Sequence, residues 1–359
     1  MPIKDGIVAV DEEGVIQGIY EPASFTLNDK VKIERYDGVI IPGFINAHCH
    51  LELSHMKGVV PKGTGLPNFL SQVMTSRSAS MKKMDDAMAK ADKEMYENGI
   101  VAVGDHANTD NSSTLKEESQ ILYHTFVEVI GVEPEEADFK LKEAKSLTQE
   151  FRNGHVSITP HAPYSCSKAL FKKFKKAVPE TNIINLDFVE RMDRDVVWCL
   201  CPKANLYIEG ALPKIHNFIN AGQPLVIGTD SLASNDTLSV LEELKALHEH
   251  FEDLDFLQTI QWATINGAVA LNIQDKYGSL EVDQVGVKGF VVNQKDGSVY
   301  IEAEGDDFAL DSMMDFCQEE SNPKPSVNNK EISQRYRYLW CDYYRFKNDR
   351  IPDDTALSP

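Results

Sequence analysis

The stretch "VIIPGFINAHCHLELSH", residues 39–55, joins an apolar run to three histidines. Two of them, His48 and His50, flank a single residue. Successive side chains of a β-strand point to opposite faces, so these two imidazoles share one face of a strand. Two nitrogen donors on one face, at a strand end, can converge on a single cation. The stretch therefore predicts a buried strand that ends at half of a metal site.

The composition is that of a globular protein with a sizeable core. The 359-residue chain is 42% hydrophobic and 26% charged, an ordinary balance. Its net charge of −20 argues against a nucleic-acid or anionic-membrane surface but leaves a small-molecule substrate open. The six cysteines form no disulfide framework, and we find neither a signal peptide nor an apolar run of membrane-spanning length. We therefore expect a cytoplasmic protein that binds a small molecule, without nucleic-acid or membrane partners.

The order of elements predicts the fold class. From about residue 42, apolar strand runs alternate with amphipathic helical stretches, the clearest at 80–98 with Ser80 as its N-terminal cap. Such alternation predicts an α/β protein with a parallel sheet, and at this length a (β/α)8 TIM-type barrel. Only seven strand runs can be counted, so we expect the barrel to lack about one βα unit. The expected domains are an accessory β unit in 1–41, the barrel in 42–275, the rest of the accessory β unit in 276–296, and a tail of unknown role in 297–359.

Candidate reactive residues follow from the strand ends, because the active sites of such barrels lie at the C-terminal ends of the strands. The second strand ends in His106, the fourth carries His161 at its tip, and the last is followed by Asp230. A lone histidine at a strand end is more often a satisfied polar residue, and this is the favoured interpretation of His106. The histidine pair of the first strand together with Asp230 is different. First and last strands are neighbours in a closed barrel, so these three side chains are expected to meet.

Four motifs resemble those of a known family: "PGFINAHCHLELSHMKG", "TPHAPYSCS", "CLCPKANLYIEG" and "VIGTDSLASN". In this order they resemble the amidohydrolase superfamily, in its branch of metal-dependent deaminases that contains cytosine deaminase, S-adenosylhomocysteine deaminase and aminodeoxyfutalosine deaminase. The resemblance extends from residue 6 to about residue 293. It implies a deformed (β/α)8 barrel with a small β-sandwich. It also implies deamination of an aminopurine nucleoside derivative, such as aminodeoxyfutalosine, by metal-bound hydroxide.

The resemblance further implies roles for individual residues. His48, His50 and Asp230 match the ligands of one divalent metal ion, Zn²⁺ first and Fe²⁺ as the alternative. Asp230 also matches the catalytic residue that takes a proton from metal-bound water. A homodimer is a candidate assembly, since barrel enzymes of this type often dimerise. The substrate-binding candidates are His161, Ser231, Asn235, Glu52 and His55.

Part of the family's pattern has no counterpart in this chain. The family's fifth strand ends in a third ligand histidine followed by a proton-donating glutamate, and its sixth ends in a histidine that polarises the attacking water. This chain has no histidine from residue 162 to residue 215, so we expect a deletion near residues 184–185. A truncated coding sequence, a naturally degenerate member and a substitute ligand such as His106 stay open as explanations. Loss of a positioned acid–base group costs about 10² to 10⁴ in rate, so the chain is expected to be weakly active or inactive.

Two rival functions stay open. One is another amidohydrolase reaction, chloride or amide hydrolysis, which would use the same metal site. The other is a non-enzymatic binding role, motivated by the missing strands. The run "HVSITPHA" has no lysine to bridge two metals, so one metal is expected. A substrate panel separates the reactions, and metal content separates the binding protein from the enzymes.

Overall fold

The computed structural model describes residues 3–11, 14–25, 38–152, 154–162, 164–177 and 197–285. Its strands are β1 (Ile7–Val10), β2 (Ile16–Tyr20), β3 (Phe44–Cys49), β4 (Ile100–Ala107), β5 (Leu122–Val129), β6 (His155–Pro160), β7 (Trp198–Leu200) and β8 (Leu225–Ile227). Its α-helices are α1 (Leu66–Ser76), α2 (Met81–Glu97), α3 (Ser113–Glu118), α4 (Ala137–Leu147), α5 (Lys168–Ala177), α6 (Pro202–Glu209), α7 (Ile215–Asn220), α8 (Val240–His248), α9 (Phe256–Ala263) and α10 (Ile265–Ala270). Single 3-10 turns are η1 (Pro22–Ser24), η2 (Leu51–Met56), η3 (Pro134–Glu136) and η4 (Thr148–Glu150).

The described elements lie close to their predicted places. β4 coincides with the run "IVAVGDHA", and α2 begins after Ser80, whose hydroxyl accepts a hydrogen bond from the Lys83 N–H at 3.4 Å. The apolar run at residues 39–42 forms no strand of its own, and Pro42 within it has no N–H to offer a ladder. The predicted strand "TNIINLD" and the predicted deletion point at residues 184–185 lie outside the described residues.

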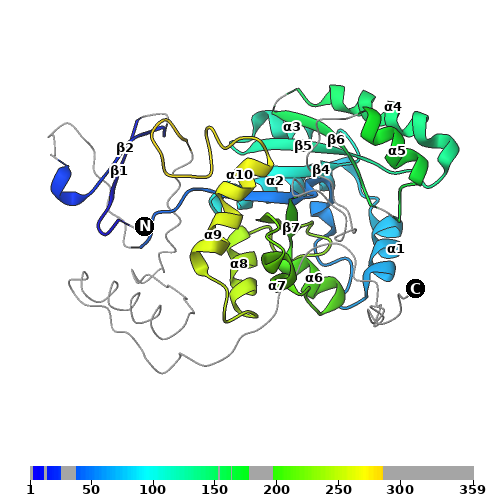
Figure 1. Ribbon diagram of the computed structural model, residues 1–359. Coiled ribbons are helices and arrows are strands. Elements are labelled where there is room, and N and C mark those ends of the chain that lie inside the picture. Colours follow the sequence, from blue (N-terminus) through cyan, green and yellow to red (C-terminus); the bar gives the residue numbers. More distant parts are fainter. Residues whose placement is uncertain are drawn as a thin grey trace, which may run out of the picture.

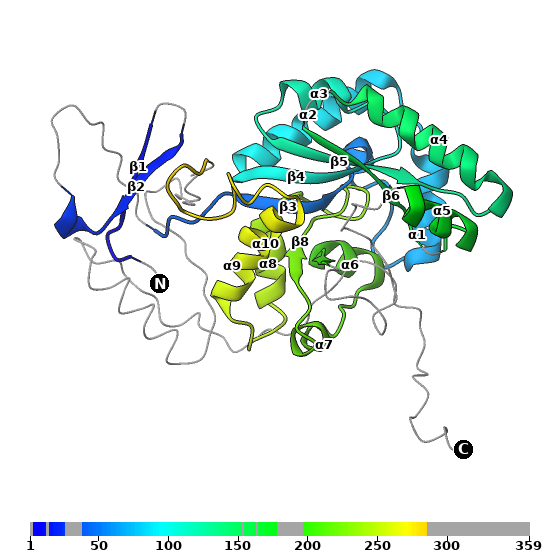
Figure 2. The same cartoon turned by 45° about the horizontal axis from the view of Figure 1, so that its top comes forward.

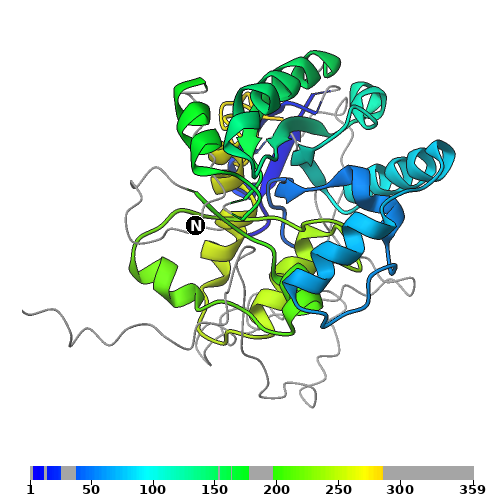
Figure 3. The same cartoon turned by 90° about the vertical axis from the view of Figure 1, so that its right-hand side faces the viewer.

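Strands β3 to β8 form two parallel sheets that meet at one edge. One sheet has the order β3-β4-β5-β6, and the other pairs β7 with β8. Between them Cys49 forms a parallel bridge with Asp230, and the N–H groups of Thr229 and Asp230 donate to the His48 carbonyl at 2.9 and 3.0 Å. We call this contact the β3–β8 seam. The combined order β7-β8-β3-β4-β5-β6 is that of the last two and first four strands of a (β/α)8 barrel, and Figure 3 shows the helices around the outside of the strands.

Buried polar contacts and one glycine hold the seam together. Asn46 Nδ2 donates to Thr229 Oγ1 at 2.8 Å, and Asn46 Oδ1 accepts from the Thr229 N–H at 3.1 Å. Both residues are fully buried, so the two bonds form in the dry interior, where an unmade bond would be costly. A Cβ at Gly228 would lie 2.7 Å from both His48 Cβ and Cys199 Sγ. Glycine therefore allows β8 to approach the metal-binding strand this closely.

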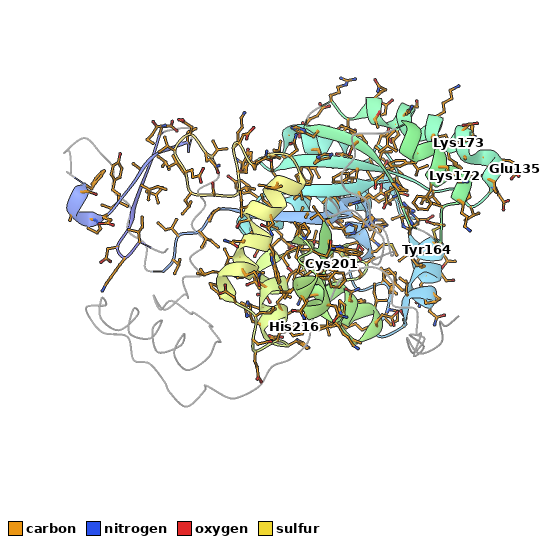
Figure 4. The ribbon with its side chains drawn as sticks, in the orientation of Figure 1. Glu135, Tyr164, Lys172, Lys173, Cys201 and His216 are labelled. Atoms are coloured by element: carbon orange, nitrogen blue, oxygen red, sulfur yellow. The ribbon has the colours of Figure 1, made fainter. Side chains whose placement is uncertain are left out.

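Helices α4 and α5 cover the outer side of β5 and β6 (Figure 1). Leu170 and Phe174 of α5 are buried in a cluster with residues of both strands. Lys172 is exposed, and Lys173 of the same helix pairs with Asp138 of α4; Figure 4 shows both lysines on this outer helix. In residues 170–174 of the basic run "LFKKFKKAV", α5 is therefore amphipathic, with its apolar side chains on the sheet and its lysines on the outer side.

A larger core lies between the remaining strands and their helices. Met88 and Met95 of α2 are buried in it, so these methionines serve packing. Side chains of β3, β4, β7, β8, α8 and α9 also belong to this cluster. Among the described helices, none combines the length and apolarity needed to cross a bilayer.

The N-terminal hairpin lies to one side of the main body (Figure 2). It consists of β1 and β2, which pair antiparallel. The Ile16 N–H donates to the Gln284 carbonyl at 2.8 Å, and the Asp283 N–H donates to the Ile16 carbonyl at 2.9 Å. The chain that follows α10 thus returns to the hairpin. Of the predicted accessory unit and tail, residues 286–296 and 297–359 lie outside the described residues.

Candidate metal centre

His48, His50 and Asp230 come together at the C-terminal ends of β3 and β8. The Nε2 atoms of His48 and His50 lie 3.8 and 3.6 Å from Asp230 Oδ1. One donor atom from each of the three residues lies within 4.8 Å of the others, and all three side chains are buried. Ligands about 2.0–2.2 Å from a zinc ion lie about 3.4 Å from one another in a tetrahedral site. The donor set and its spacing therefore fit a single divalent metal ion.

Burial and neighbouring charge act differently on the three donors. Burial, together with the nearby imidazole of His50, lowers the pKa of His48 well below its ordinary value. Burial alone would also lower the pKa of His50, but surrounding carboxylates, Glu128 foremost, leave it raised. Burial raises the pKa of Asp230 against the opposing effect of His50. A bound divalent cation favours neutral imidazoles and an ionised carboxylate, the forms in which all three side chains can ligate.

Asp230 is presented by an unusual backbone and held by a neighbouring hydroxyl. Its φ of +55° is left-handed, a conformation uncommon for a residue other than glycine. Ser234 Oγ donates to Asp230 Oδ2 at 2.6 Å, which leaves Oδ1 as the oxygen that faces the imidazoles. Ser234 is fully buried and is not among the residues predicted from the sequence, although it belongs to the same "GTDSLASN" motif. Its role depends on the loop folding back on Asp230.

His161 lies at the end of β6, on the same edge of the sheet. Its N–H donates to the Val129 carbonyl at 3.1 Å, and its Nδ1 lies 2.7 Å from Ser165 Oγ. That hydroxyl also donates to the Ala162 carbonyl at 3.1 Å. Tyr164, seen in the loop after β6 in Figure 4, packs edge-on against the imidazole at 5.7 Å. Contact of His161 with substrate stays a prediction.

Glu52 and His55 lie in η2 and tie neighbouring segments together. Glu52 Oε1 lies 3.1 Å from Arg77, and its Oε2 accepts from the N–H groups of Asn108 and Thr109 and from Thr109 Oγ1 at 3.2, 3.1 and 2.8 Å. The ring nitrogens of His55 face the carbonyls of Glu52 and Arg77 at 3.1 and 2.8 Å. Both oxygens of Glu52 therefore already have donors. Substrate binding by these two residues stays a prediction.

Ser231 and Asn235 support the loop that carries Asp230. Asn235 Nδ2 donates to the Thr229 carbonyl at 2.9 Å and to Glu243 Oε1 at 2.7 Å. Ser231 Oγ lies 3.2 Å from Ser234 Oγ. Both residues are buried, and their contacts hold the loop in place. That they contact the substrate stays a prediction.

Two side chains beside the centre, His106 and Glu128, were not predicted as site residues. The His106 ring lies 4.2 Å from that of His48 and 5.5 Å from that of His50, and it stacks on Phe126 at 5.0 Å. Its buried Nδ1 has no hydrogen-bond partner among the described residues, contrary to the interpretation of His106 as a satisfied polar residue. Glu128 follows Phe126 by two residues on the same face of β5. The alternation in "HTFVEVIG" was the available signal for Glu128.

Comparison with known proteins places the chain in a family. Residues 39–185 and, as a separate match, residues 178–286 match the amidohydrolase family. The chain belongs to the amidohydrolase family. Residues 281–338 match a second family, acylphosphatase. That match begins inside the segment predicted to complete the accessory unit and covers much of the predicted tail, and most of it lies outside the described residues.

Relatives of this amidohydrolase include several nucleoside deaminases. It is 24% identical over 335 residues to a 5'-deoxyadenosine deaminase of Methanococcoides burtonii, a match that covers 76% of each chain. The structure resembles that of Helicobacter pylori aminofutalosine deaminase in complex with methylthio-coformycin, with a TM-score of 0.64, 20% identity and coverage of 86% of this chain and 90% of that one. It also resembles an adenosine deaminase from Xanthomonas campestris with bound zinc, with a TM-score of 0.63, 21% identity and 78% of each chain covered. The amidohydrolase thus has an α/β fold of the TIM-barrel type, and by family it is a hydrolase of the aminohydrolase type.

Proposed function

We propose that this amidohydrolase retains the metal centre of an enzyme that hydrolytically removes the amino group of an aminopurine nucleoside derivative. The observation that carries the proposal is the convergence of His48, His50 and Asp230 at the β3–β8 seam. Catalytic zinc sites commonly use three protein ligands and keep one position open, so these three residues can hold an ion without a third histidine. Two imidazoles and a carboxylate suit Zn²⁺, with Fe²⁺ as the alternative.

The relatives support the substrate class. Those named above act on 5'-deoxyadenosine, aminofutalosine and adenosine by their names, and all three substrates carry an adenine base on a sugar. We therefore propose an adenosine derivative, with aminodeoxyfutalosine as one candidate.

The side chains of the centre are arranged to hold a metal ion and to transfer protons. A divalent metal at this centre would lower the pKa of a coordinated water to about 7, which supplies hydroxide near neutral pH. Ser234 holds Asp230 Oδ2, and Oδ1 faces the two imidazoles, so this carboxylate is placed to take a proton from a water at the centre. His161 lies at the same edge of the sheet, at the end of β6, and we propose that its imidazole contacts the substrate.

We also propose that the barrel lacks about one βα unit between β6 and β7. No pairing between these two strands occurs in the described part of the chain. The family match falls into two segments that overlap at residues 178–185. The alignment with the Methanococcoides relative runs over 335 residues, more than the 76% of this 359-residue chain that it uses, so it places gaps in this chain. The family's third ligand histidine and its two acid–base residues would belong to that unit, and their loss leaves the chain weakly active or inactive.

The test compares this chain with a chain that contains the missing βα unit. The sequence of that unit is to be recovered by resequencing the gene across codons 184–185. Both are loaded with zinc, and ammonia release is measured from adenosine, 5'-deoxyadenosine, 5'-methylthioadenosine, S-adenosylhomocysteine and aminodeoxyfutalosine. We expect about one metal ion per chain in both, and a gain of at least about 10² in rate on restoration. Rapid turnover by the present chain would contradict its impairment. If the restored chain deaminates none of these nucleosides but releases chloride from a chlorinated heterocycle, the rival hydrolytic reaction is supported. If neither chain binds metal, a non-enzymatic binding role is supported.

A cytoplasmic location and a homodimer stay predictions from the sequence. In the described part of the chain, Cys49, Cys166, Cys199 and Cys201 form no disulfide bond. Light scattering on the purified chain tests the dimer.

A further inference from the structure

Glu128 lies on the side of β5 that faces the metal centre. Phe126 fixes this direction, because its ring stacks on His106 and His106 packs against the two metal-binding histidines. The alternate residues Val127 and Val129 are buried in the cluster with α4 and α5 on the other side. Glu128 is one step nearer the C-terminal end of β5 than Phe126 is on the same face. It therefore lies at the edge of the sheet where the metal donors are found.

One oxygen of the Glu128 carboxylate is held and the other is available. Asn108 Nδ2 donates to Glu128 Oε2 at 2.7 Å, and the Asn108 backbone is fixed in turn by Glu52. In the described part of the chain Oε1 accepts no hydrogen bond, and no basic side chain pairs with the carboxylate. Glu128 is also the foremost charge that raises the pKa of His50, which indicates that it lies close to that ligand. A half-buried carboxylate gains from a donor that a ligand brings.

Glu52, the carboxylate chosen from the sequence, is engaged differently. Its two oxygens together accept from Arg77, Asn108 and Thr109, and its side chain is buried. A substrate hydroxyl would have to compete with these donors. Glu128 has an oxygen available for a ligand without such competition.

We propose that Glu128, oriented by Asn108, is a specificity residue whose Oε1 accepts a hydrogen bond from the substrate. The donor is an O–H of the sugar or an N–H of the base, since an ionised carboxylate accepts hydrogen bonds and donates none. This inference rests on the proposed function. Through this contact the centre would favour a ligand that places an O–H or N–H group at Glu128 Oε1 over a ligand that places a carbonyl there.

The test is the affinity of the full zinc-loaded chain for adenosine, measured by calorimetry in the wild type and in Glu128→Gln. Glutamine keeps the size of the side chain and can still accept from Asn108, but it then presents an N–H group in place of the free acceptor. We expect the Kd to rise about 10- to 100-fold, the loss typical of a hydrogen bond to a charged group. The matched control is Glu135→Gln, an exposed acid of η3 that Figure 4 shows at the outer end of α4 and α5. Zinc content and Tm of both variants should equal those of the wild type.

A second ligand identifies the donor. With 2',3'-dideoxyadenosine the penalty of Glu128→Gln should vanish if the 2'- or 3'-hydroxyl is the donor, and persist if the 5'-hydroxyl or the base is; either result supports the inference. An unchanged adenosine Kd in Glu128→Gln, with zinc content and Tm intact, would overturn the inference and leave the proposed function standing. No nucleoside binding by either protein would overturn the proposed function and the inference with it. Should Glu128→Gln fold poorly, Glu128→Asp, which withdraws the carboxylate by one methylene, is judged by the same measurements.

Discussion

The two oxygens of the Asp230 carboxylate have different surroundings. Ser234 holds Oδ2, and Oδ1 faces the imidazoles of His48 and His50. Hydrogen bonds from residues behind the ligands commonly orient metal ligands, and their removal typically costs 10- to 100-fold in metal affinity. The orientation of Asp230 thus depends on a residue that does not itself face the metal.

Removal of that hydroxyl should weaken metal binding. In Ser234→Ala, Oδ2 loses its donor and the carboxylate can rotate, so we expect the zinc Kd to rise about 10- to 100-fold. Chelator competition on the purified protein measures this Kd. Ser231→Ala is the control, because the Ser231 hydroxyl contacts Ser234 Oγ and its loss leaves the Ser234–Asp230 bond in place. Equal zinc affinities of all three proteins would show that Ser234 does not position Asp230.

Glu243 makes the stability of the fold depend on pH. Burial raises the pKa of Glu243 to about 8, even though its oxygens accept from the Lys203 N–H and from Asn235 Nδ2. Between the ordinary glutamate pKa and about 8, the folded chain keeps a proton that the unfolded chain releases. The stabilisation is full below the ordinary pKa and is lost as pH rises toward 8, with a slope of up to about 1.4 kcal/mol per pH unit. Urea unfolding at several pH values should show this decline in the wild type and a flatter profile in Glu243→Gln; parallel profiles would contradict it.

At the scale of elements, a buried ion pair joins α3 to the sheet. Lys116 Nζ of α3 lies 2.6 Å from Asp105 Oδ2 of β4, and both side chains are buried. Asp105 Oδ1 accepts from the Leu51 N–H at 2.7 Å, and Lys116 also donates to Thr125 of β5 at 3.0 Å. One pair of charges therefore links η2, α3 and two neighbouring strands. Its position next to the metal-binding strand makes it part of the support of the centre.

Removal of one partner of this pair should be strongly destabilising. Lys116→Met leaves the Asp105 carboxylate buried without its cation, and we expect the free energy of unfolding to fall by about 3–5 kcal/mol. Chemical denaturation measures the change. Lys82→Met, which removes an exposed pair with Asp86 on α2, should have little effect. The double variant Asp105→Asn with Lys116→Met should lose less than the two single changes added together, since no uncompensated charge remains; full additivity would argue against the pairing.

At the scale of the whole molecule, the metal donors come from opposite ends of the barrel sequence. Asn46 and Thr229, 183 residues apart, hold together the strands that carry them. An ion that binds only this folded arrangement stabilises it by mass action, by about 2.7 kcal/mol at a concentration of 100 Kd.

Zinc should therefore raise the unfolding temperature. We expect the Tm of the chelator-treated protein to rise by about 5–10 °C at zinc concentrations near 100 Kd. Differential scanning fluorimetry measures it. The variant His50→Ala should lose most of the shift, and an equal shift in that variant would place the bound zinc elsewhere.

Much of this organisation can be predicted from short stretches. The bounds of β4, the Ser80 cap of α2 and the pairing of His48 with His50 on one face follow from alternation, helical periodicity and capping, which act within a few residues. The participation of Asp230 needed the additional expectation that first and last strands meet. The three-residue lengths of β7 and β8 were not predictable, because the apolar runs around them continue into buried turns.

The sequence determines which strand ends carry reactive side chains, whereas the tertiary structure determines which carboxylates are available to a ligand. Alternation along a strand is a consequence of covalent backbone geometry, so residues 39–50 alone determine that two histidines share one face at the end of a strand. Whether a carboxylate is occupied or open to a ligand depends on donors far away in the chain. Arg77, Asn108 and Thr109 engage Glu52, whereas Asn108 holds only one oxygen of Glu128. Only the tertiary structure decides which of the two carboxylates is occupied, because hydrogen bonds form between groups that packing brings close together, however far apart they lie in the sequence.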